Sequence, residues 1–287
     1  MLAIYKKELR SYFNSLVGYV FISFFLAVIG LYFFVYNINQ GQPNFEYALA
    51  SISFVYMILV PIITMKIMAE ENKQKTDQLL LTSPVSIHSI VIGKYLAVMT
   101  VYGIVMLICC AFPLILGRYG TVNYKTAYSA ILGTLFLGGA FLAIGLFVST
   151  CTENQLVAAV VTFLIVLLAT LSDGIASLLP TDNRSAWIVF SAILLILVLV
   201  SYLIMRNPLI SLGAAAIGEV ALTVLFLVKP AIYDGSVVKV FGWFSILARY
   251  DDFTSGILNV TSIIYYISII FLFNFLAVQG LNKRRWS

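Results

Sequence analysis

Charged side chains are scarce in this 287-residue chain. Asp, Glu, Lys and Arg make up only 10% of it, whereas 62% of its residues are hydrophobic and the mean hydropathy is +1.03. A water-soluble domain carries about 25% charged residues, so the chain has too little polar surface to cover a core of its size. This composition excludes an intrinsically disordered chain, a secreted disulfide scaffold and a free nucleic-acid-binding domain. It indicates a protein surrounded by lipid.

Cysteine and histidine are equally few. The three cysteines are Cys109, Cys110 and Cys151, and they have no CxxC or Cys/His spacing, so we expect neither a disulfide framework nor a metal site. The single histidine, His88, has no second metal ligand near it and lies outside the apolar runs. An intramembrane hydrolase would need such groups at membrane depth, so the sequence argues against enzymatic activity and predicts no metal.

Eight apolar runs are long enough to cross a membrane, since a helix needs about 20 apolar residues to span a hydrocarbon layer of about 30 Å. They cover residues 16–36, 48–65, 90–116, 126–148, 156–171, 187–205, 209–228 and 262–278. Lipid offers no hydrogen-bond partners, so runs of this length must be α-helices. The sequence predicts one all-α transmembrane domain over residues 1–287 with about eight spans.

Basic residues predict the orientation. With the N-terminus inside, eleven of the 17 Lys and Arg residues lie on the inner side and six on the outer side. Inner loops carry an excess of Lys and Arg, so we expect both termini in the cytoplasm. The expected location is the cell membrane, specifically a bacterial inner membrane.

Residues 1–15 have the pattern of a short amphipathic helix. The apolar side chains recur at helical spacing, at Leu2, Tyr5, Leu9 and Tyr12, and the basic ones lie between them, at Lys6, Lys7 and Arg10. This pattern is typical of a helix lying in the membrane interface. A basic flank that only orients the first span is the alternative.

The predicted inner loop, residues 68–88, contains three consecutive leucines. Leu79, Leu80 and Leu81 precede Thr82 and Pro84. Their exposure to water would cost several kcal/mol, at about 25 cal/mol per Å². The leucines either form a helical face that docks on another protein or cover the end of the chain's own helix bundle.

Residues 229–260 form the longest predicted outer connection. The segment is too interrupted to span a membrane but is rich in aromatic and charged side chains, among them Phe241, Trp243, Phe244, Arg249, Asp251 and Asp252. It favours the outer interface or a shallow re-entrant hairpin. Its role is then an aromatic anchor or a lid over an outward-facing exit.

Glu219 is the one carboxylate inside the run 209–228. A charge at membrane depth is costly and faces the bundle or water. Glu219 is therefore a candidate intramembrane polar site. Two interpretations remain, a role in substrate or proton handling and a structural pairing with hydroxyl groups of neighbouring spans.

Several segments together resemble one family. Residues 6–9 (KKEL), 69–86 and 92–96 (IGKYL), supported by 244–253, 264–268 and 283–287, are similar to the ABC type 2 exporter permeases, especially their gliding-motility-type branch. Two departures stand out. Lys75-Thr76 replaces a Gly-Thr pair that is frequent in the family, and the family core has six spans, so residues 187–228 look like an added helical pair.

The resemblance implies an exporter permease driven by a separate ATPase subunit. In the family, the loop between the second and third spans couples to that subunit. The residues that carry over are Glu70, Glu71, Asp77, Leu79, Leu80, Leu81, Thr82, Pro84 and Val85. A second permease subunit, identical or different, would complete the pathway. An additional periplasmic or membrane subunit and membrane lipid are further candidate partners. Nucleic acid is not expected as a partner.

The ATPase motif itself is absent from this chain. The only Gly-Lys pair, Gly93-Lys94, lacks the upstream glycine of a phosphate-binding loop. We therefore expect this chain to bind no cofactor and ATP with Mg²⁺ to be bound by the partner. A secondary active transporter, or a membrane assembly subunit without ATP coupling, is the alternative function.

Overall fold

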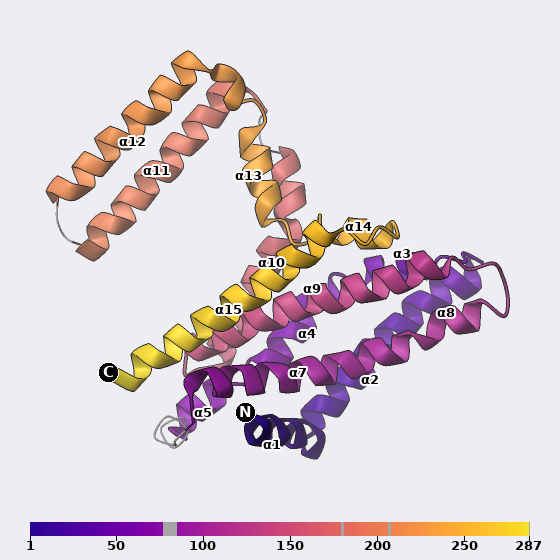
Figure 1. The fold of residues 1–287 in the computed structure, drawn as a ribbon. Coiled ribbons are helices and arrows are strands. Elements are labelled where there is room, and N and C mark those ends of the chain that lie inside the picture. Colours follow the sequence, from indigo (N-terminus) through magenta and orange to yellow (C-terminus); the bar gives the residue numbers. More distant parts are fainter. Residues whose placement is uncertain (77–84, 179–180, 206–207, 287) are drawn as a thin grey trace. The chain divides into compact units, whose positions relative to one another are not determined.

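The computed structural model describes residues 1–76, 85–178, 181–205 and 208–286. Within these residues all regular structure is helical, which confirms the predicted all-α class (Figure 1). The chain divides into two compact units. Unit 1 comprises Met1–Thr170 and Ile246–Ser287, and unit 2 comprises Leu171–Ser245.

Unit 1 is built around one central helix, α9 (Tyr124–Cys151), most of which is buried. The helices before it are α1 (Leu2–Asn14), α2 (Leu16–Phe33), the π-helix η1 (Phe34–Asn39), α3 (Phe45–Ser51), α4 (Val55–Thr64), α5 (Ala69–Gln74), α7 (Ile87–Cys109) and α8 (Ala111–Leu116). Those after it are the first part of α10 (Gln155–Leu178), α14 (Tyr250–Thr254) and α15 (Val260–Trp286). Helices α3, α4, α7, α14 and α15 all pack on α9.

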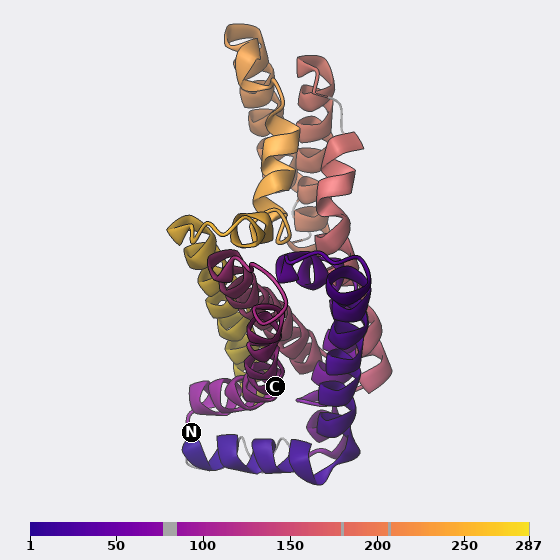
Figure 2. The same ribbon diagram turned by 90° about the vertical axis from the view of Figure 1, so that its right-hand side faces the viewer.

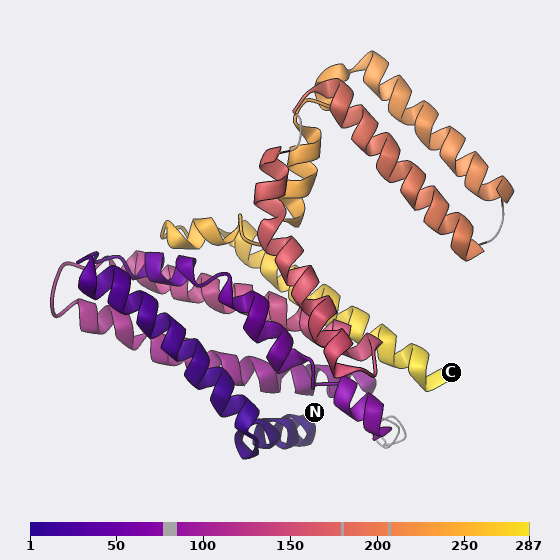
Figure 3. The same ribbon diagram turned by 180° about the vertical axis from the view of Figure 1, so that it is seen from behind.

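Two views show how these helices are layered. In Figure 3, α2 and α4 run side by side in front of α7 and α9. Helix α1 does not join this layer but crosses the end of α2, as Figure 2 shows. The amphipathic helix predicted over residues 1–15 is therefore present, and its place at a membrane surface stays a prediction.

Small residues on α9 allow its neighbours to approach closely. A Cβ atom added at Gly138 would overlap the ring of Tyr102 on α7, and one added at Gly145 would overlap Thr64 at the end of α4. Glycine stripes serve the same purpose in membrane helices generally, because they let backbones approach. At both positions α9 meets its neighbour without room for a side chain.

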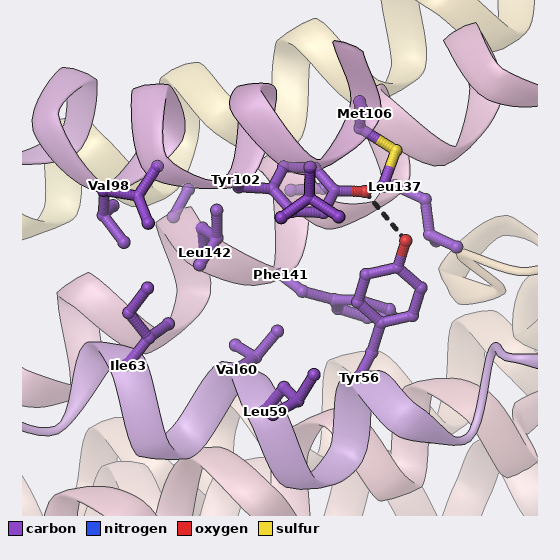
Figure 4. Packing of buried hydrophobic residues seen from close by; sticks show 14 of the residues in the cluster. Tyr56, Leu59, Val60, Ile63, Val98, Tyr102, Met106, Leu137, Phe141 and Leu142 are labelled. Atoms are coloured by element: carbon purple, nitrogen blue, oxygen red, sulfur yellow. Dashed lines mark hydrogen bonds between the residues drawn. The ribbon is translucent and has the colours of Figure 1, made fainter. Parts of the chain in front are cut away.

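A series of hydrogen bonds joins four helices inside this core, and Figure 4 shows its first link, between Tyr56 and Tyr102. The Tyr56 hydroxyl of α4 lies 2.8 Å from that of Tyr102, which donates to the carbonyl oxygen of Thr134 at 2.6 Å. The Thr134 hydroxyl in turn lies 2.9 Å from the Tyr250 hydroxyl of α14. Buried polar groups need such partners. These hydrogen bonds link α4, α7, α9 and α14 and give the hydroxyl groups of Tyr56, Tyr102 and Tyr250 a partner each.

The span predicted over residues 48–65 is broken. Phe45–Ser51 and Val55–Gln74 meet at an angle of 63°. At the break, the Ser51 hydroxyl bonds to the carbonyl of Tyr47 and the Ser53 hydroxyl to that of Ala50, each at 2.8 Å. Serine hydroxyls compete with the backbone for helix carbonyls, and here they accompany the turn that replaces a continuous helix.

Among the described residues, five helices are long and apolar enough to cross a membrane, or up to seven if each of two bent pairs counts as one span. The five are Leu16–Asn39, Ile87–Leu116, Tyr124–Cys151, Gln155–Ser172 and Val260–Arg285. The bent pairs are Phe45–Ser51 with Val55–Gln74 and Ala215–Val228 with Pro230–Val240. Asn183–Ile196 is a shorter apolar helix, so a count of eight spans, like the orientation, stays a prediction.

Unit 2 contains the end of α10, α11 (Asn183–Met205), α12 (Pro208–Val228), the 3₁₀ turn η2 (Pro230–Ile232) and α13 (Ser236–Phe244). Helices α11 and α12 form a hairpin. Ala186, Tyr233 and Val237 are buried where α13 meets it, and the Tyr233 hydroxyl donates to the carbonyl of Leu222 at 2.9 Å. The predicted helical pair 187–228 lies within this unit.

The contact between α7 and α9 yields a first prediction. Replacing Gly138 by Ala places a methyl group in the Tyr102 ring, and we expect a loss of about 1–3 kcal/mol in stability from overpacking. Thermal unfolding of the purified protein in detergent measures it. The matched control is Gly103→Ala on α7, where a Cβ meets nothing within 4 Å, and which should be neutral or stabilising. Equal melting temperatures for the two variants would contradict the close contact.

Candidate functional site

The start of α5 is fixed to the end of α9 by one serine. The backbone N–H groups of Met68 and Ala69 both donate to the hydroxyl oxygen of Ser149, each at 3.0 Å. Ser149 is fully buried, and its own hydroxyl donates to the carbonyl of Met65 at 3.3 Å. The first N–H groups of a helix need partners outside the helix, and Ser149 supplies one for the turn that leads from α4 into α5.

The inner side of α5 carries a second contact to the end of α9. The Asn72 side chain is 3% exposed and donates from Nδ2 to the carbonyl oxygen of Thr152 at 3.2 Å. At the C-terminal end of the helix, Lys73, Gln74 and Lys75 are exposed. Helix α5 is thus anchored through Met68, Ala69 and Asn72 and accessible at its C-terminal end.

A Schellman motif ends α5. The N–H of Thr76 bonds to the carbonyl of Glu71 at 3.0 Å and that of Lys75 to the carbonyl of Asn72 at 3.3 Å, which is the hydrogen-bond pattern of this motif. Lys75 occupies the left-handed position with φ of 54°, the only positive φ of a non-glycine residue among those described. Glycine is the usual residue there.

A buried lysine joins α5 to two other helices. The Lys94 side chain of α7 is 1% exposed. Its Nζ lies 2.8 Å from the carbonyl oxygen of Ile67, 3.1 Å from Glu8 Oε1 of α1 and 2.9 Å from Glu71 Oε2 of α5. Lys94 donates hydrogen bonds to Ile67 and Glu8, whereas Glu71 Oε2 pairs with it by charge and has no hydrogen-bond partner in the described structure.

Lys7 of α1 lies at the edge of this group. Its Nζ is 3.3 Å from Glu71 Oε1 and 3.6 Å from Glu8 Oε1. Burial lowers the pKa of Lys7, but the carboxylates of Glu71 and Glu8 outweigh burial, and the pKa is raised above its usual value. We call Lys7, Glu8, Glu71 and Lys94 the Lys94 cluster; it alternates positive and negative charge across α1, α5 and α7.

A polar cavity of about 460 Å³ lies beside the Lys94 cluster. Its further lining includes Ser11 and Ser15, which precede α2, and Lys66 and Glu70, which flank the start of α5. Burial and the nearby Glu8 raise the pKa of Tyr12, which also lines it. Among residues 1–76, 85–178, 181–205 and 208–286, no group of three or more His, Cys, Asp or Glu side chains could hold a metal ion.

The structure places only part of the predicted coupling residues. Glu70 and Glu71 lie in the first turn of α5, where acidic side chains suit the helix dipole. Val85 packs partly buried against the core of unit 1. The other six fall outside the described residues; they are Asp77, Leu79, Leu80, Leu81, Thr82 and Pro84.

The residues predicted for an outer lid divide between the two units. Phe241, Trp243 and Phe244 lie on α13 of unit 2, and Trp243 is 69% exposed. The remaining three, Arg249, Asp251 and Asp252, lie in unit 1 at or in α14. Here Asp252 Oδ2 accepts hydrogen bonds from the Ser262 hydroxyl at 2.6 Å and the Asn259 amide at 3.1 Å. These bonds fix the turn that leads into α15, and Arg249 lies 5.5 Å from the centre of the Tyr265 ring.

Glu219 lies inside the hairpin of unit 2. The Ser191 hydroxyl of α11 donates to Glu219 Oε2 at 3.0 Å, and Oε1 is buried without a hydrogen-bond partner in the described structure. At the next contact along the hairpin, Gly218 faces the side chain of Leu194. The observed pairing is the one with a hydroxyl of a neighbouring helix.

Sequence reasoning missed the role of Lys94 and Glu8. Lys94 counted only as an inner basic residue and as the end of a Gly-Lys pair that is no phosphate-binding loop. The available signal was the pair itself, because a Cβ at Gly93 would lie 3.3 Å from Ile4 Cγ2 of α1.

The anchoring of α5 by Ser149 yields a second prediction. Ser149→Ala removes the acceptor of two backbone N–H groups, and a buried group left unsatisfied costs about 1–3 kcal/mol. We expect faster hydrogen exchange at the amides of residues 68–72 and a lower melting temperature. Ser268→Ala is the matched control, because the exposed Ser268 hydroxyl only bonds back to Ile264 of its own helix. Unchanged exchange in Ser149→Ala would show that this hydroxyl does not hold α5.

The left-handed end of α5 yields a third prediction. Lys75→Gly removes the cost of a side chain at positive φ, which is about 1–2 kcal/mol. The greater freedom of glycine in the unfolded chain opposes this gain in stability. We expect the amides of α5 to exchange more slowly. The matched change Lys73→Gly, inside the helix, should have the opposite effect and cost about 1 kcal/mol. Faster exchange in Lys75→Gly would contradict the observed turn.

Comparison with known proteins agrees with this architecture. A family model described as ABC-2 family transporter protein matches residues 36–232, which is more than half of the chain. It includes α5 and Lys94 and excludes α1. No curated protein matches the chain. Together with the long apolar helices, the match shows a multi-pass membrane protein, and the chain belongs to the ABC-2 transporter family.

Proposed function

We propose that this chain is the membrane permease subunit of an ATP-driven exporter of the gliding-motility type, and that residues 68–88 couple it to a separate ATPase subunit. Both termini and this loop then lie in the cytoplasm. Family membership supports the permease role. ATP and Mg²⁺ are bound by the partner, and a second permease subunit completes the pathway.

The observation that carries the coupling role is that α5 is both anchored and accessible. A segment that transmits force has to be fixed to the membrane helices and also accessible to the partner. Ser149 and Lys94 fix α5 to α9 and α7, while Lys73 and Lys75 are exposed at its C-terminal end. A loop that merely connected two spans would need neither a buried ion pair nor a shared serine acceptor.

The proposed cycle follows from rigid-body motion. Closure of two ATPase subunits on ATP brings the two coupling loops together, and helices fixed to those loops move with them. ATP binding shifts the equilibrium between inward and outward access only to the extent that it favours one state over the other. In this proposal the chain supplies the pathway and the levers, and the partner supplies the energy.

Cross-linking tests the coupling role. A photoreactive amino acid at Lys73, in the full complex purified from cells that make both subunits, should cross-link to the ATPase subunit. The same group at Lys125, an exposed residue in the first turn of α9 and on the predicted outer side, should not. Mass spectrometry of the cross-linked band identifies the partner.

Two outcomes would contradict the proposal. If no ATPase subunit cross-links from Lys73 while one co-purifies, the loop is not the contact. A second contradiction would be that no ATPase subunit co-purifies with the chain and that the purified chain alone transports solute into vesicles when an ion gradient is imposed. The chain would then be better described as a secondary active transporter.

A further inference from the structure

We propose that Lys94 transmits the movement of α5 to helix α7 and to α1, so that α1, α5 and the Lys94 end of α7 move as one body. The inference rests on the proposed function, because the movement is the one that an ATPase subunit imposes on α5. Lys94 is a positioning residue, since it acts through Glu8 and Glu71 and contacts neither nucleotide nor substrate.

The ammonium group of Lys94 has no alternative partner in water. It is 1% exposed, and its three oxygen neighbours come from α1, from α5 and from Ile67 in the turn before α5. If α5 moved without α7, the buried ammonium group would lose Glu71, one of its two carboxylate partners, and at 1% exposure it could not gain water in exchange. Removing a partner from a buried charge is strongly disfavoured. The charge therefore moves with α5, and α7 moves with its lysine.

Helix α1 belongs to the same body through contacts that do not involve charge. Gly93 has no side chain where Ile4 packs, and a Cβ there would lie 3.4 Å from Ile4 Cβ and 3.4 Å from the Met1 carbonyl oxygen. Further along α7, the Tyr5 hydroxyl lies 3.1 Å from the Thr100 hydroxyl. Glu8 adds the charged contact to Lys94 at 3.1 Å. Three contacts along α7 thus prevent α1 from sliding.

The contacts of α5 to α9 differ in kind. They are hydrogen bonds between neutral groups, from Met68, Ala69 and Asn72. The contacts of α5 to α1 and α7 pair charges instead: Lys7 donates to Glu71 Oε1 at 3.3 Å, and Lys94 Nζ lies 2.9 Å from Glu71 Oε2. Because Lys94 is buried, losing this pair costs more than losing a neutral hydrogen bond. Displacement of α5 is thus transmitted first to α1 and α7, and the far end of α7, which continues through α8 to Tyr119, is where the movement should be seen.

Distance measurements by spin labelling test this transmission. Labels replace Tyr119, beyond α8, and Ile257, before α15; both are exposed, at 87% and 58%. The complex with its ATPase subunit is placed in lipid nanodiscs, and the distance between labels is measured with and without a non-hydrolysable ATP analogue. We expect the nucleotide to shift this distance in the wild type and not in Lys94→Met, although the ATPase subunit still co-purifies.

Two further variants keep the test valid if Lys94→Met fails to assemble. Glu8→Gln and Glu71→Gln retain oxygen acceptors but remove charge, and each should reduce the nucleotide-induced shift. Glu153→Gln is the matched control: Glu153 is 70% exposed and pairs with Arg284 at 3.7 Å, so the shift should be unchanged. A full shift in both Glu8→Gln and Glu71→Gln would overturn the proposal.

A disulfide provides an independent test of rigidity. In Ile4→Cys/Gly93→Cys the Cβ atoms lie close to the separation of about 3.5–4.5 Å that a disulfide requires. If α1 and α7 move together, oxidation leaves the nucleotide-induced shift intact. Loss of the shift on oxidation, restored by reduction and absent from the single-cysteine variants, would show that α1 moves against α7 and would overturn the proposal.

Absence of any nucleotide-induced shift in the wild-type complex would remove the proposed function and the role of Lys94 with it. A shift in the wild type that persists in Lys94→Met would remove only the role of Lys94.

Discussion

Polar groups inside unit 1 must find their partners within the protein, and this requirement organises the structure. Its long helices are apolar enough to lie in hydrocarbon, where no water can complete a hydrogen bond. Two networks meet the requirement. Near the middle of α7, Tyr102 links Tyr56 to Thr134, and two turns earlier Lys94 links Glu8 to Glu71. Each network joins helices that are distant in sequence.

The two networks differ in what happens when a partner leaves. A neutral hydrogen bond contributes about 0.5–1.5 kcal/mol net, and a buried hydroxyl group left without a partner costs about 1–3 kcal/mol. Removing one partner from a buried ion pair costs about 3–5 kcal/mol. Losing a charged partner from the Lys94 cluster therefore costs more than losing one bond of the tyrosine chain. That property is useful where a segment has to transmit displacement.

Sequence reasoning succeeded where length and composition decide the outcome. The apolar runs predicted helices, and short segments spread over the chain predicted the ABC-2 family, because both are local properties. It failed where a partner distant in sequence decides. Lys94 and Glu8 are 86 positions apart, and no periodicity connects them. The break in the span predicted over 48–65 was missed because Ser51 and Ser53 are as compatible with a helix as with a turn until their carbonyl partners are known.

The end of α5 shows how a departure from a family pattern can still preserve geometry. The family resemblance leads one to expect Gly-Thr where this chain has Lys75-Thr76, and Lys75 adopts the left-handed conformation that glycine takes without cost. The Schellman hydrogen bonds of Lys75 and Thr76 hold it there. A cation at this position also faces the negative end of the helix dipole, which contributes about 0.3–1 kcal/mol. The lysine thus offsets part of its own backbone strain, and it places a positive charge at the exposed C-terminal end of α5, where the proposed partner would meet it. In a loop that only connected two spans, glycine in place of Lys75 would increase stability and nothing would be lost. The strained backbone of Lys75 is therefore better explained at a surface that contacts a partner.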